Sequence, residues 1–286
     1  MNTDSSEATL SEKEQKLNDI LKEPGRVVIA FSGGVDSTLL LYAASQALGK
    51  NAMGVTIAGP YIPKWEVDEA IEFTNKFNIS HEVIEAEFLE ALRESPEDRC
   101  YHCKSFLFAS LKKYAAERNA VLIEGTNHDD LGDYRPGLKA LSELEVRSPL
   151  LEAGLTKQNI RDLSKKWKLP TWDKPAYACL LTRIPFGDHV TEQSLRMIET
   201  AETDLIQLGF RAVRVRHYGD LARIELPPER LTEAATEPTR TKIISAVKNA
   251  GYKFVTLDLS GYRMGSLNPK QNCPPAYADI SQHKSM

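Results

Sequence analysis

A continuous apolar run followed by a glycine-rich loop constrains the fold of this chain more than any other feature. Residues 27–31 (VVIAF) contain no polar residue, so they predict a strand that is buried on both faces, as in a parallel sheet. The loop 32–37 (SGGVDS) follows directly, and residues 38–48 have a helical composition. A buried strand that passes through a tight turn into a helix is the first part of an α/β unit.

Strands and helices continue to alternate after this unit. Helices are expected over residues 64–77 and 104–118, and an S-x-x-E capping box at 11–14 predicts the start of a short helix before the first strand. The further expected strands are 53–58, 82–84 and 121–124. This order predicts an α/β fold with a doubly wound parallel sheet.

The pattern changes after about residue 186. The expected elements are a helix over 191–208, strands over 212–217 and 222–226, a helix over 239–250 and a strand over 253–259. This α-β-β-α-β order predicts a smaller C-terminal α+β domain. We therefore expect a first domain over residues 1–186, a second over 187–268, and a disordered tail over 269–286, where polar residues and proline dominate.

Composition sets limits on location and partners. The 286 residues carry a formal net charge of -4, which does not support a broad nucleic-acid surface. No apolar stretch is long enough to cross a bilayer, and the polar N-terminal sequence lacks the pattern of a signal peptide. We therefore expect a cytoplasmic protein without a membrane partner, whose cysteines stay reduced and act as ligands or nucleophiles.

The loop 32–37 has the composition of a phosphate-binding turn. Its glycines allow a sharp turn that brings backbone N–H groups close to an anion, and the helix that follows adds unsatisfied N–H donors. Ser32, Ser37 and Thr38 add hydroxyl donors, and the Asp36 carboxylate could hold a magnesium ion. A plain glycine turn between a strand and a helix is the alternative. The six loop residues are Ser32, Gly33, Gly34, Val35, Asp36 and Ser37.

This loop and its setting resemble the PP-loop of the ATP pyrophosphatase (N-type) superfamily, and the G-x-x-x-x-G-K-[ST] motif is absent. A second loop, GTNHDD at 125–130, follows the strand 121–124 at the edge of the sheet where ligands bind. The resemblance implies that Gly125, Thr126 and Asn127 lie beside ATP and that Asp130 lies near the magnesium ion. It also implies that a carboxyl or carbonyl group is adenylated and pyrophosphate is released. An Asx-rich turn without a ligand is the alternative.

Three cysteines could carry the chemistry. Cys100 and Cys103 form a C-x-x-C pair, and Cys179 lies further along the chain. Three thiolates can hold a [4Fe-4S] cluster with one open iron, or a zinc ion with a vacant position. A redox dithiol and buried structural cysteines are the alternatives. Cys179 can also be a nucleophile, since Lys174 and Arg183 lie nearby in the sequence and could stabilise its thiolate.

Alternating residues predict a basic β-hairpin. In RAVRVRH at 211–217, Arg214 and Arg216 are expected on one strand face, and Arg223 and Glu225 share a face of the next strand. Paired arginines suit bidentate binding of a phosphate monoester. A solvated charged face is the usual explanation of such a pattern.

Several motifs, in order, extend the resemblance over residues 10–268. They are RCYHCK at 99–104, DLGDYRPG at 130–137, ACLLTRIP at 178–185, RVR at 214–216, ARIE at 222–225 and GYRMGS at 261–266. Together with the PP-loop, they closely resemble the LarE family of ATP-dependent sulfur transferases. Members of that family act in nickel-pincer nucleotide biosynthesis, which makes the cofactor of lactate racemase.

The resemblance implies a sulfur-insertion reaction. ATP adenylates a carboxylate of pyridinium-3,5-biscarboxylic acid mononucleotide, and a sulfur nucleophile displaces AMP to leave a thiocarboxylate. In one branch of the family, a cysteine matching Cys179 gives up its own sulfur and ends as dehydroalanine. In another branch, three cysteines bind a [4Fe-4S] cluster whose open iron carries the transferred sulfide. Cys100, Cys103 and Cys179 make this chain similar to the cluster branch, with the source of the sulfur left open.

The resemblance also implies further roles and partners. Arg214 and Arg216 would bind the substrate phosphate, Arg183 would orient the substrate carboxylate, and Glu202 and Glu225 would lie near a metal where protomers meet. Family members form homo-oligomers, often hexamers, and work with upstream and downstream enzymes of the same cofactor pathway. The alternatives are a tRNA-thiolating PP-loop enzyme, an amide-forming relative such as NAD or GMP synthetase, and a nucleotide-binding iron–sulfur protein without turnover.

Overall fold

The computed structural model describes residues 4–132 and 136–263, which form two compact units. The first unit holds the chain up to Leu92 and then Glu97–Ala178, and the second holds Arg93–Pro96 and the chain from Cys179 onward. The sequence predicts a boundary after residue 186, whereas the structure places the short helix at Leu180–Arg183 with the second unit, because Arg183 bonds to Glu202 there. The predicted tail, 269–286, lies outside the described residues.

The first unit is built on a parallel sheet of four strands in the order β3-β2-β1-β4. The strands are β1 (Val27–Ala30), β2 (Ala52–Ala58), β3 (Ser80–Glu85) and β4 (Val121–Ile123). In the register, Val27 lies opposite Ala52 of β2 and Val121 of β4, so β1 is central. The prediction of a parallel α/β sheet is therefore confirmed.

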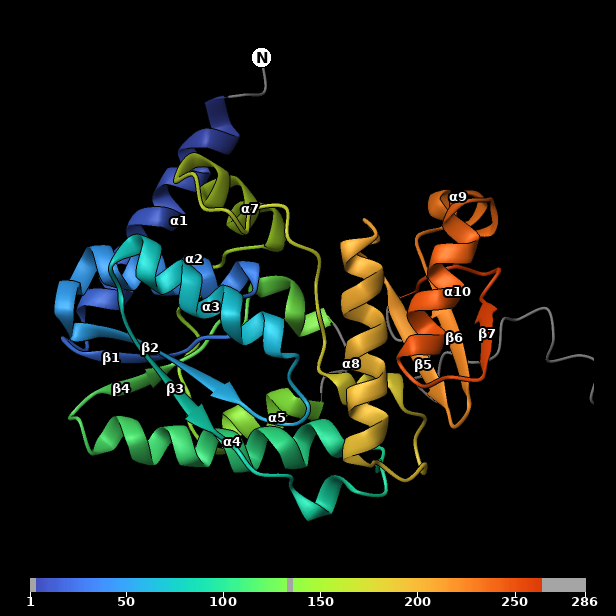
Figure 1. The fold of residues 1–286 in the computed structure, drawn as a ribbon. Coiled ribbons are helices and arrows are strands. Elements are labelled where there is room, and N and C mark those ends of the chain that lie inside the picture. Colours follow the sequence, from blue (N-terminus) through green and yellow to red (C-terminus); the bar gives the residue numbers. More distant parts are fainter. Residues whose placement is uncertain (1–3, 133–135, 264–286) are drawn as a thin grey trace, which may run out of the picture. The chain divides into compact units, whose positions relative to one another are not determined.

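Helices cover both faces of this sheet, as Figure 1 shows. One face carries α1 (Asp4–Lys22), α2 (Val35–Leu48), α3 (Lys64–Phe77), α6 (Pro149–Glu152) and α7 (Lys157–Lys166), and the other carries α4 (Arg99–Ala116). Successive residues of β1 point to opposite faces: Val27 and Ile29 enter the core with α2, and Val28 packs with Leu111 of α4. Two-sided burial explains why the strand reads as an unbroken apolar run.

Several boundaries differ from those the sequence predicts. The helix expected to begin at the capping box 11–14 already begins at Asp4, so that prediction is wrong: Ser11 lies within α1, where the motif cannot act as a cap. The sequence predicts no element for α5 (Pro136–Glu143), α6 or α7. A capping box does open α7, since the Thr156 hydroxyl accepts from the Asn159 N–H at 3.2 Å and the Asn159 side chain bonds back.

The second unit has the predicted α-β-β-α-β order with an additional short helix. Its elements are α8 (Glu192–Gln207), β5 (Arg214–Tyr218), β6 (Leu221–Glu225), α9 (Leu231–Ala235), α10 (Thr239–Asn249) and β7 (Phe254–Leu257). β5 and β6 pair as the expected antiparallel hairpin, and β7 runs parallel to β6. Leu205, Val215 and Val247 are among the residues that form its core. None of the helices in the described ranges combines the length and apolar character needed to cross a bilayer.

Candidate active site

The phosphate loop joins the end of β1 to the start of α2. Gly33 has φ +67°, a conformation that glycine adopts without strain, and Gly34 is the N-cap of α2. The Ser37 hydroxyl closes the turn, because it lies 3.1 Å from the Ser32 hydroxyl, accepts from the Ser32 N–H at 3.3 Å and donates to the Gly34 carbonyl at 3.3 Å. The backbone thus forms a compact concave turn at the carboxyl end of the central strand.

The phosphate loop contains a row of backbone N–H groups that its own hydrogen bonds do not use. Thr38 N–H donates to the Gly34 carbonyl at 2.9 Å. Within the described part of the chain, no acceptor is assigned to the N–H groups of Gly33, Gly34, Val35 and Asp36. Unsatisfied N–H groups at a helix N-terminus, together with the positive end of the helix dipole, form an anion-binding site. The Thr38 hydroxyl, expected to join these donors, is fully buried in α2 and has no partner among the described residues.

Asp36, the acidic residue of the loop, is bound from the other side of the site by Lys157. The Lys157 ammonium group donates to both carboxylate oxygens of Asp36, at 2.6 Å for Oδ1, and Asn127 Nδ2 donates to the same Oδ1 at 3.3 Å. Lys157 is the first residue of α7, and its own N–H donates to Asp129. Lys157 is not among the residues predicted from the sequence. Its capping box could have located the start of α7, but no local pattern indicates the pairing with Asp36.

The second loop, which follows β4, contacts the first. A Cβ atom added to Gly125 would lie 3.1 Å from the Ser37 nitrogen, which is tighter than an ordinary contact, so a larger residue here would require a small shift between the two loops. The Glu124 carboxylate holds the second loop by accepting from the Thr126 N–H at 3.0 Å and from its hydroxyl at 2.9 Å. The loop is thus fixed beside the phosphate loop at the β1–β4 edge, where ligands bind in open α/β sheets.

The carboxylate of Asp130, a predicted magnesium ligand, forms a hydrogen bond within its own loop. It accepts from the Asn127 N–H at 3.0 Å, and the residue is buried. Asn127 is itself fully buried, and its side-chain oxygen accepts from the Asp129 N–H at 2.9 Å. Asn127 therefore links this loop to Asp36, and the magnesium role of Asp130 stays a prediction.

The three described cysteines are divided between the two units, and none of them forms a disulfide. Cys100 and Cys103 lie in the first two turns of α4, and a spacing of three places them on the same side of the helix. The carbonyl of Cys179 accepts from the Thr182 hydroxyl at 2.9 Å and from Arg183 at 3.2 Å. Within residues 4–132 and 136–263, no group of three His, Cys, Asp or Glu side chains is arranged to hold a metal ion. The cluster therefore stays a prediction.

In the second unit, Arg183 and Glu202 form a buried ion pair. Arg183 Nε and Nη2 donate to the two Glu202 oxygens at 2.8 and 2.7 Å, and their side chains are only 1% and 3% exposed. Glu202 also accepts from the N–H of Val215 on β5 at 2.8 Å. Such a bidentate pair fixes the planar guanidinium in one orientation.

The hairpin arginines extend this buried network. Arg216 donates to Glu225 at 2.6 Å and to the Thr182 carbonyl at 2.6 Å, and Arg223 donates to Glu225 at 3.0 Å. Arg214 lies over the ring of Tyr262, 5.0 Å from its centroid. Burial, followed by the nearby positive charge of Arg183, lowers the pKa of Arg214.

The alternative of a solvated charged face is wrong, because Arg214 and Arg216 are only 3% and 5% exposed. Glu202 and Glu225, predicted near an interface metal, are bonded here to arginines of their own chain. That metal role stays a prediction.

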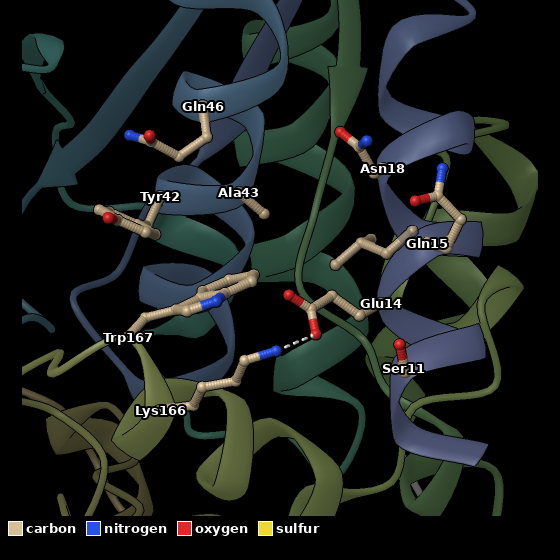
Figure 2. A pocket seen from close by; sticks show the side chains of 10 residues that line it. Ser11, Glu14, Gln15, Asn18, Tyr42, Ala43, Gln46, Lys166 and Trp167 are labelled. Atoms are coloured by element: carbon tan, nitrogen blue, oxygen red, sulfur yellow. Dashed lines mark hydrogen bonds and ion pairs between the residues drawn. The ribbon is translucent and has the colours of Figure 1, made fainter. Parts of the chain in front are cut away.

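A separate pocket of about 430 Å³ lies in the first unit among α1, α2 and α7. Figure 2 shows its lining, in which Lys166 reaches Glu14 at 2.7 Å and the Trp167 indole faces the cavity. Of the lining residues on α2, Tyr42 is the nearest in sequence to the phosphate loop. It lies roughly 10 Å along the helix axis from Val35, where α2 begins. The pocket is thus distinct from the phosphate loop, and it contains none of the predicted site residues.

The fold and the loop define the class of this protein. A four-stranded parallel sheet with the SGGVDS loop after its central strand is the architecture of PP-loop, adenine nucleotide alpha hydrolase-like proteins. In agreement, residues 9–129 match the family model described as NAD synthase.

Matches to known proteins that extend over both units show a narrower family. The chain is 34% identical over 265 residues to the pyridinium-3,5-bisthiocarboxylic acid mononucleotide synthase of Lactiplantibacillus plantarum, covering 91% of this chain and 95% of that protein. An uncharacterized protein of Synechocystis sp. is 40% identical over 262 residues, covering 91% and 98%. A glutamine-hydrolyzing GMP synthase subunit of Thermoplasma acidophilum is 37% identical over 187 residues, but this covers only 57% and 58%. The chain belongs to the LarE-like family of pyridinium-3,5-bisthiocarboxylic acid mononucleotide synthases.

Proposed function

We propose that this chain is an ATP-dependent sulfur transferase that converts a carboxylate of pyridinium-3,5-biscarboxylic acid mononucleotide to a thiocarboxylate. The observation that carries the proposal is the row of backbone donors at the phosphate loop, with Asp36 beside it. The match to the synthase of L. plantarum supports the substrate, since it covers 91% of this chain and both of its units.

In the adenylation step, a substrate carboxylate oxygen attacks the α-phosphorus of ATP and pyrophosphate leaves. The negative charge that develops on the leaving group needs fixed donors, which the N–H groups at the start of α2 supply. Asp36 suits a magnesium site, because magnesium is held by one or two carboxylates together with substrate phosphates. The ion would neutralise phosphate charge. With Asp36 bound to such an ion, the Lys157 ammonium group would become available to the leaving pyrophosphate.

For the substrate, we propose that the phosphate is held by Arg214 and Arg216 of the hairpin. These guanidinium groups are buried beside one another, so a phosphate that reaches them is held in a site with little water. Arg183 would orient the substrate carboxylate, and Glu202 fixes the plane of its guanidinium.

We also propose that the active protein is a homo-oligomer, which light scattering on the purified protein would test.

For the sulfur, we propose that Cys100, Cys103 and Cys179 bind a [4Fe-4S] cluster. Three thiolates fit such a cluster with one iron left open, and the C-x-x-C pair lies on one side of α4. The cluster would supply an external sulfide for transfer. In the alternative, the Cys179 thiolate displaces AMP from the acyl adenylate and forms a thioester. Loss of the Cys179 Cα proton with cleavage of the Cβ–S bond then releases the thiocarboxylate and leaves dehydroalanine.

Anaerobic purification with iron and sulfide analysis tests the proposal, together with pyrophosphate release and intact mass before and after turnover. We expect bound iron and sulfide, substrate-dependent pyrophosphate release and an unchanged polypeptide mass. A colourless protein whose mass falls by one hydrogen sulfide at Cys179 would exclude the cluster and support the sacrificial route. ATP binding without substrate-dependent pyrophosphate release would contradict the proposed enzyme altogether.

A further inference from the structure

A buried lysine, Lys174, is bonded to the phosphate loop from behind. It is only 8% exposed, and its ammonium group donates to the Gly33 carbonyl at 2.9 Å and to Glu69 of α3 at 2.6 Å. Burying an ammonium group costs free energy unless it is paired and hydrogen-bonded. The sequence indicates Lys174 only as a charge near Cys179, and its bond to Gly33 is a feature of the folded chain.

The position of this ammonium group is fixed on several sides. It lies 5.7 Å from the ring centroid of Trp65 and 5.9 Å from that of Tyr177, and these two rings meet edge to face at 4.8 Å. Arg161 of α7 donates to the Lys174 carbonyl at 3.1 Å, so the backbone that carries the lysine is anchored as well. Both distances are within the range of cation–π contacts, which help to hold the ammonium group in this position.

The bond to Gly33 determines the direction of one donor of the phosphate loop. A trans peptide is planar, so the carbonyl of Gly33 and the N–H of Gly34 point in opposite directions. The peptide joins two glycines and Gly33 has φ +67°, so it could rotate with little steric resistance. With its carbonyl held by Lys174, the peptide directs the Gly34 N–H away from the lysine, and this N–H is one of the loop donors with no assigned acceptor in the described chain.

We propose that Lys174 is a positioning residue that sets the Gly33–Gly34 peptide for binding the pyrophosphate part of ATP. The inference rests on the proposed function, since it takes ATP as the ligand of the loop. Glu69 helps to hold Lys174 in this position, because its carboxylate accepts from the same ammonium group. The Glu69 side chain is itself half exposed.

The test compares ligands with and without the pyrophosphate part by isothermal titration calorimetry. We expect Lys174→Met to weaken the binding of inorganic pyrophosphate and of ATP about tenfold, as for the loss of one directed charged contact. The affinity for AMP should change less than about threefold, because AMP lacks the β- and γ-phosphates. Glu69→Gln should also weaken the binding of pyrophosphate and ATP more than that of AMP, but by smaller factors. This variant replaces Lys174→Met in the test if Lys174→Met folds poorly.

Lys165→Met is the matched control, since Lys165 also lies over a tryptophan, Trp172 at 5.1 Å, but is exposed. It should bind all three ligands as the wild type does. Equal losses for pyrophosphate and AMP in Lys174→Met would show a general structural role, and unchanged pyrophosphate binding would show no role; either result overturns the inference. A wild-type protein that binds neither ATP nor pyrophosphate would instead contradict the proposed function.

Discussion

Lys157 and Asp36 form an ion pair across the mouth of the phosphate loop, between the first residue of α7 and the second residue of α2. The two residues are 121 positions apart in the sequence, and Asn127 donates to the same carboxylate. A cation therefore occupies the position where the proposed mechanism needs a magnesium ion. Removal of the Lys157 ammonium group should therefore change how strongly Asp36 binds a metal ion.

Lys157→Met should release Asp36 from its competitor. In the absence of nucleotide, we expect the variant to bind Mn²⁺ several-fold more tightly than the wild type, because the carboxylate no longer has to break an ion pair. Electron paramagnetic resonance titration of free Mn²⁺ measures this affinity. The same variant should release pyrophosphate at least about tenfold more slowly, since a positive charge near the leaving group is lost. Weaker Mn²⁺ binding in the variant would contradict this account of the pair.

Asp36→Asn should strongly reduce catalysis without unfolding the loop. The loop is closed by Ser37 rather than by Asp36, so we expect thermal stability to change little. Pyrophosphate release should fall on the order of a hundredfold or more, because the magnesium ligand is lost. Asp68→Asn on the exposed face of α3 is the control and should retain full activity. A variant at Asp36 that keeps more than about a tenth of the activity would exclude it as the metal ligand.

The contact between the two loops can be tested by adding one methyl group. In Gly125→Ala, the new Cβ would lie 3.1 Å from the Ser37 nitrogen and 3.4 Å from Asp36, which is close for both contacts. We expect a loss of about 1–3 kcal/mol in the free energy of unfolding, as for overpacked sites, and weaker ATP binding. Urea unfolding and calorimetry measure the two effects. ATP affinity equal to that of the wild type would show that this approach of the loops is not needed for binding.

The buried pair Arg183–Glu202 should behave differently from the exposed pairs. Glu202→Gln leaves a buried guanidinium without its counter-charge, and we expect it to lower the free energy of unfolding by about 3–5 kcal/mol. The double variant Arg183→Met with Glu202→Leu removes both charges and should recover much of that stability but no activity. Asp68→Asn, which breaks the exposed pair with Lys64, should cost less than about 1 kcal/mol. Failure of the double variant to recover stability would point to a packing role for the pair.

The sequence predicted the elements that local patterns encode. The apolar run gave β1, the loop after it gave the start of α2, and the alternation at 212–217 gave β5. The sequence could not show that the charged face of β5 is buried, because alternation identifies a face without identifying what covers it. The bonds of Lys157 to Asp36 and of Lys174 to Gly33 could not be predicted either, because the partners are 121 and 141 positions apart and no local pattern encodes such pairs.

A half-buried histidine, His81, should make stability depend on pH. Thr56 donates its single hydroxyl proton to the Phe31 carbonyl at 2.7 Å, so the His81 ring must donate from Nε2 to that hydroxyl oxygen at 2.8 Å. Burial lowers the pKa of His81 in the folded state, so below about pH 6.5, the ordinary value for histidine, the unfolded chain binds more protons and stability falls. We expect the free energy of unfolding to decrease between pH 7 and pH 5.5, and to decrease less in His81→Gln. Burial also lowers the pKa of His217, so that variant should keep part of the dependence. Equal slopes for wild type and His81→Gln in urea unfolding across this range would show that His81 titrates normally.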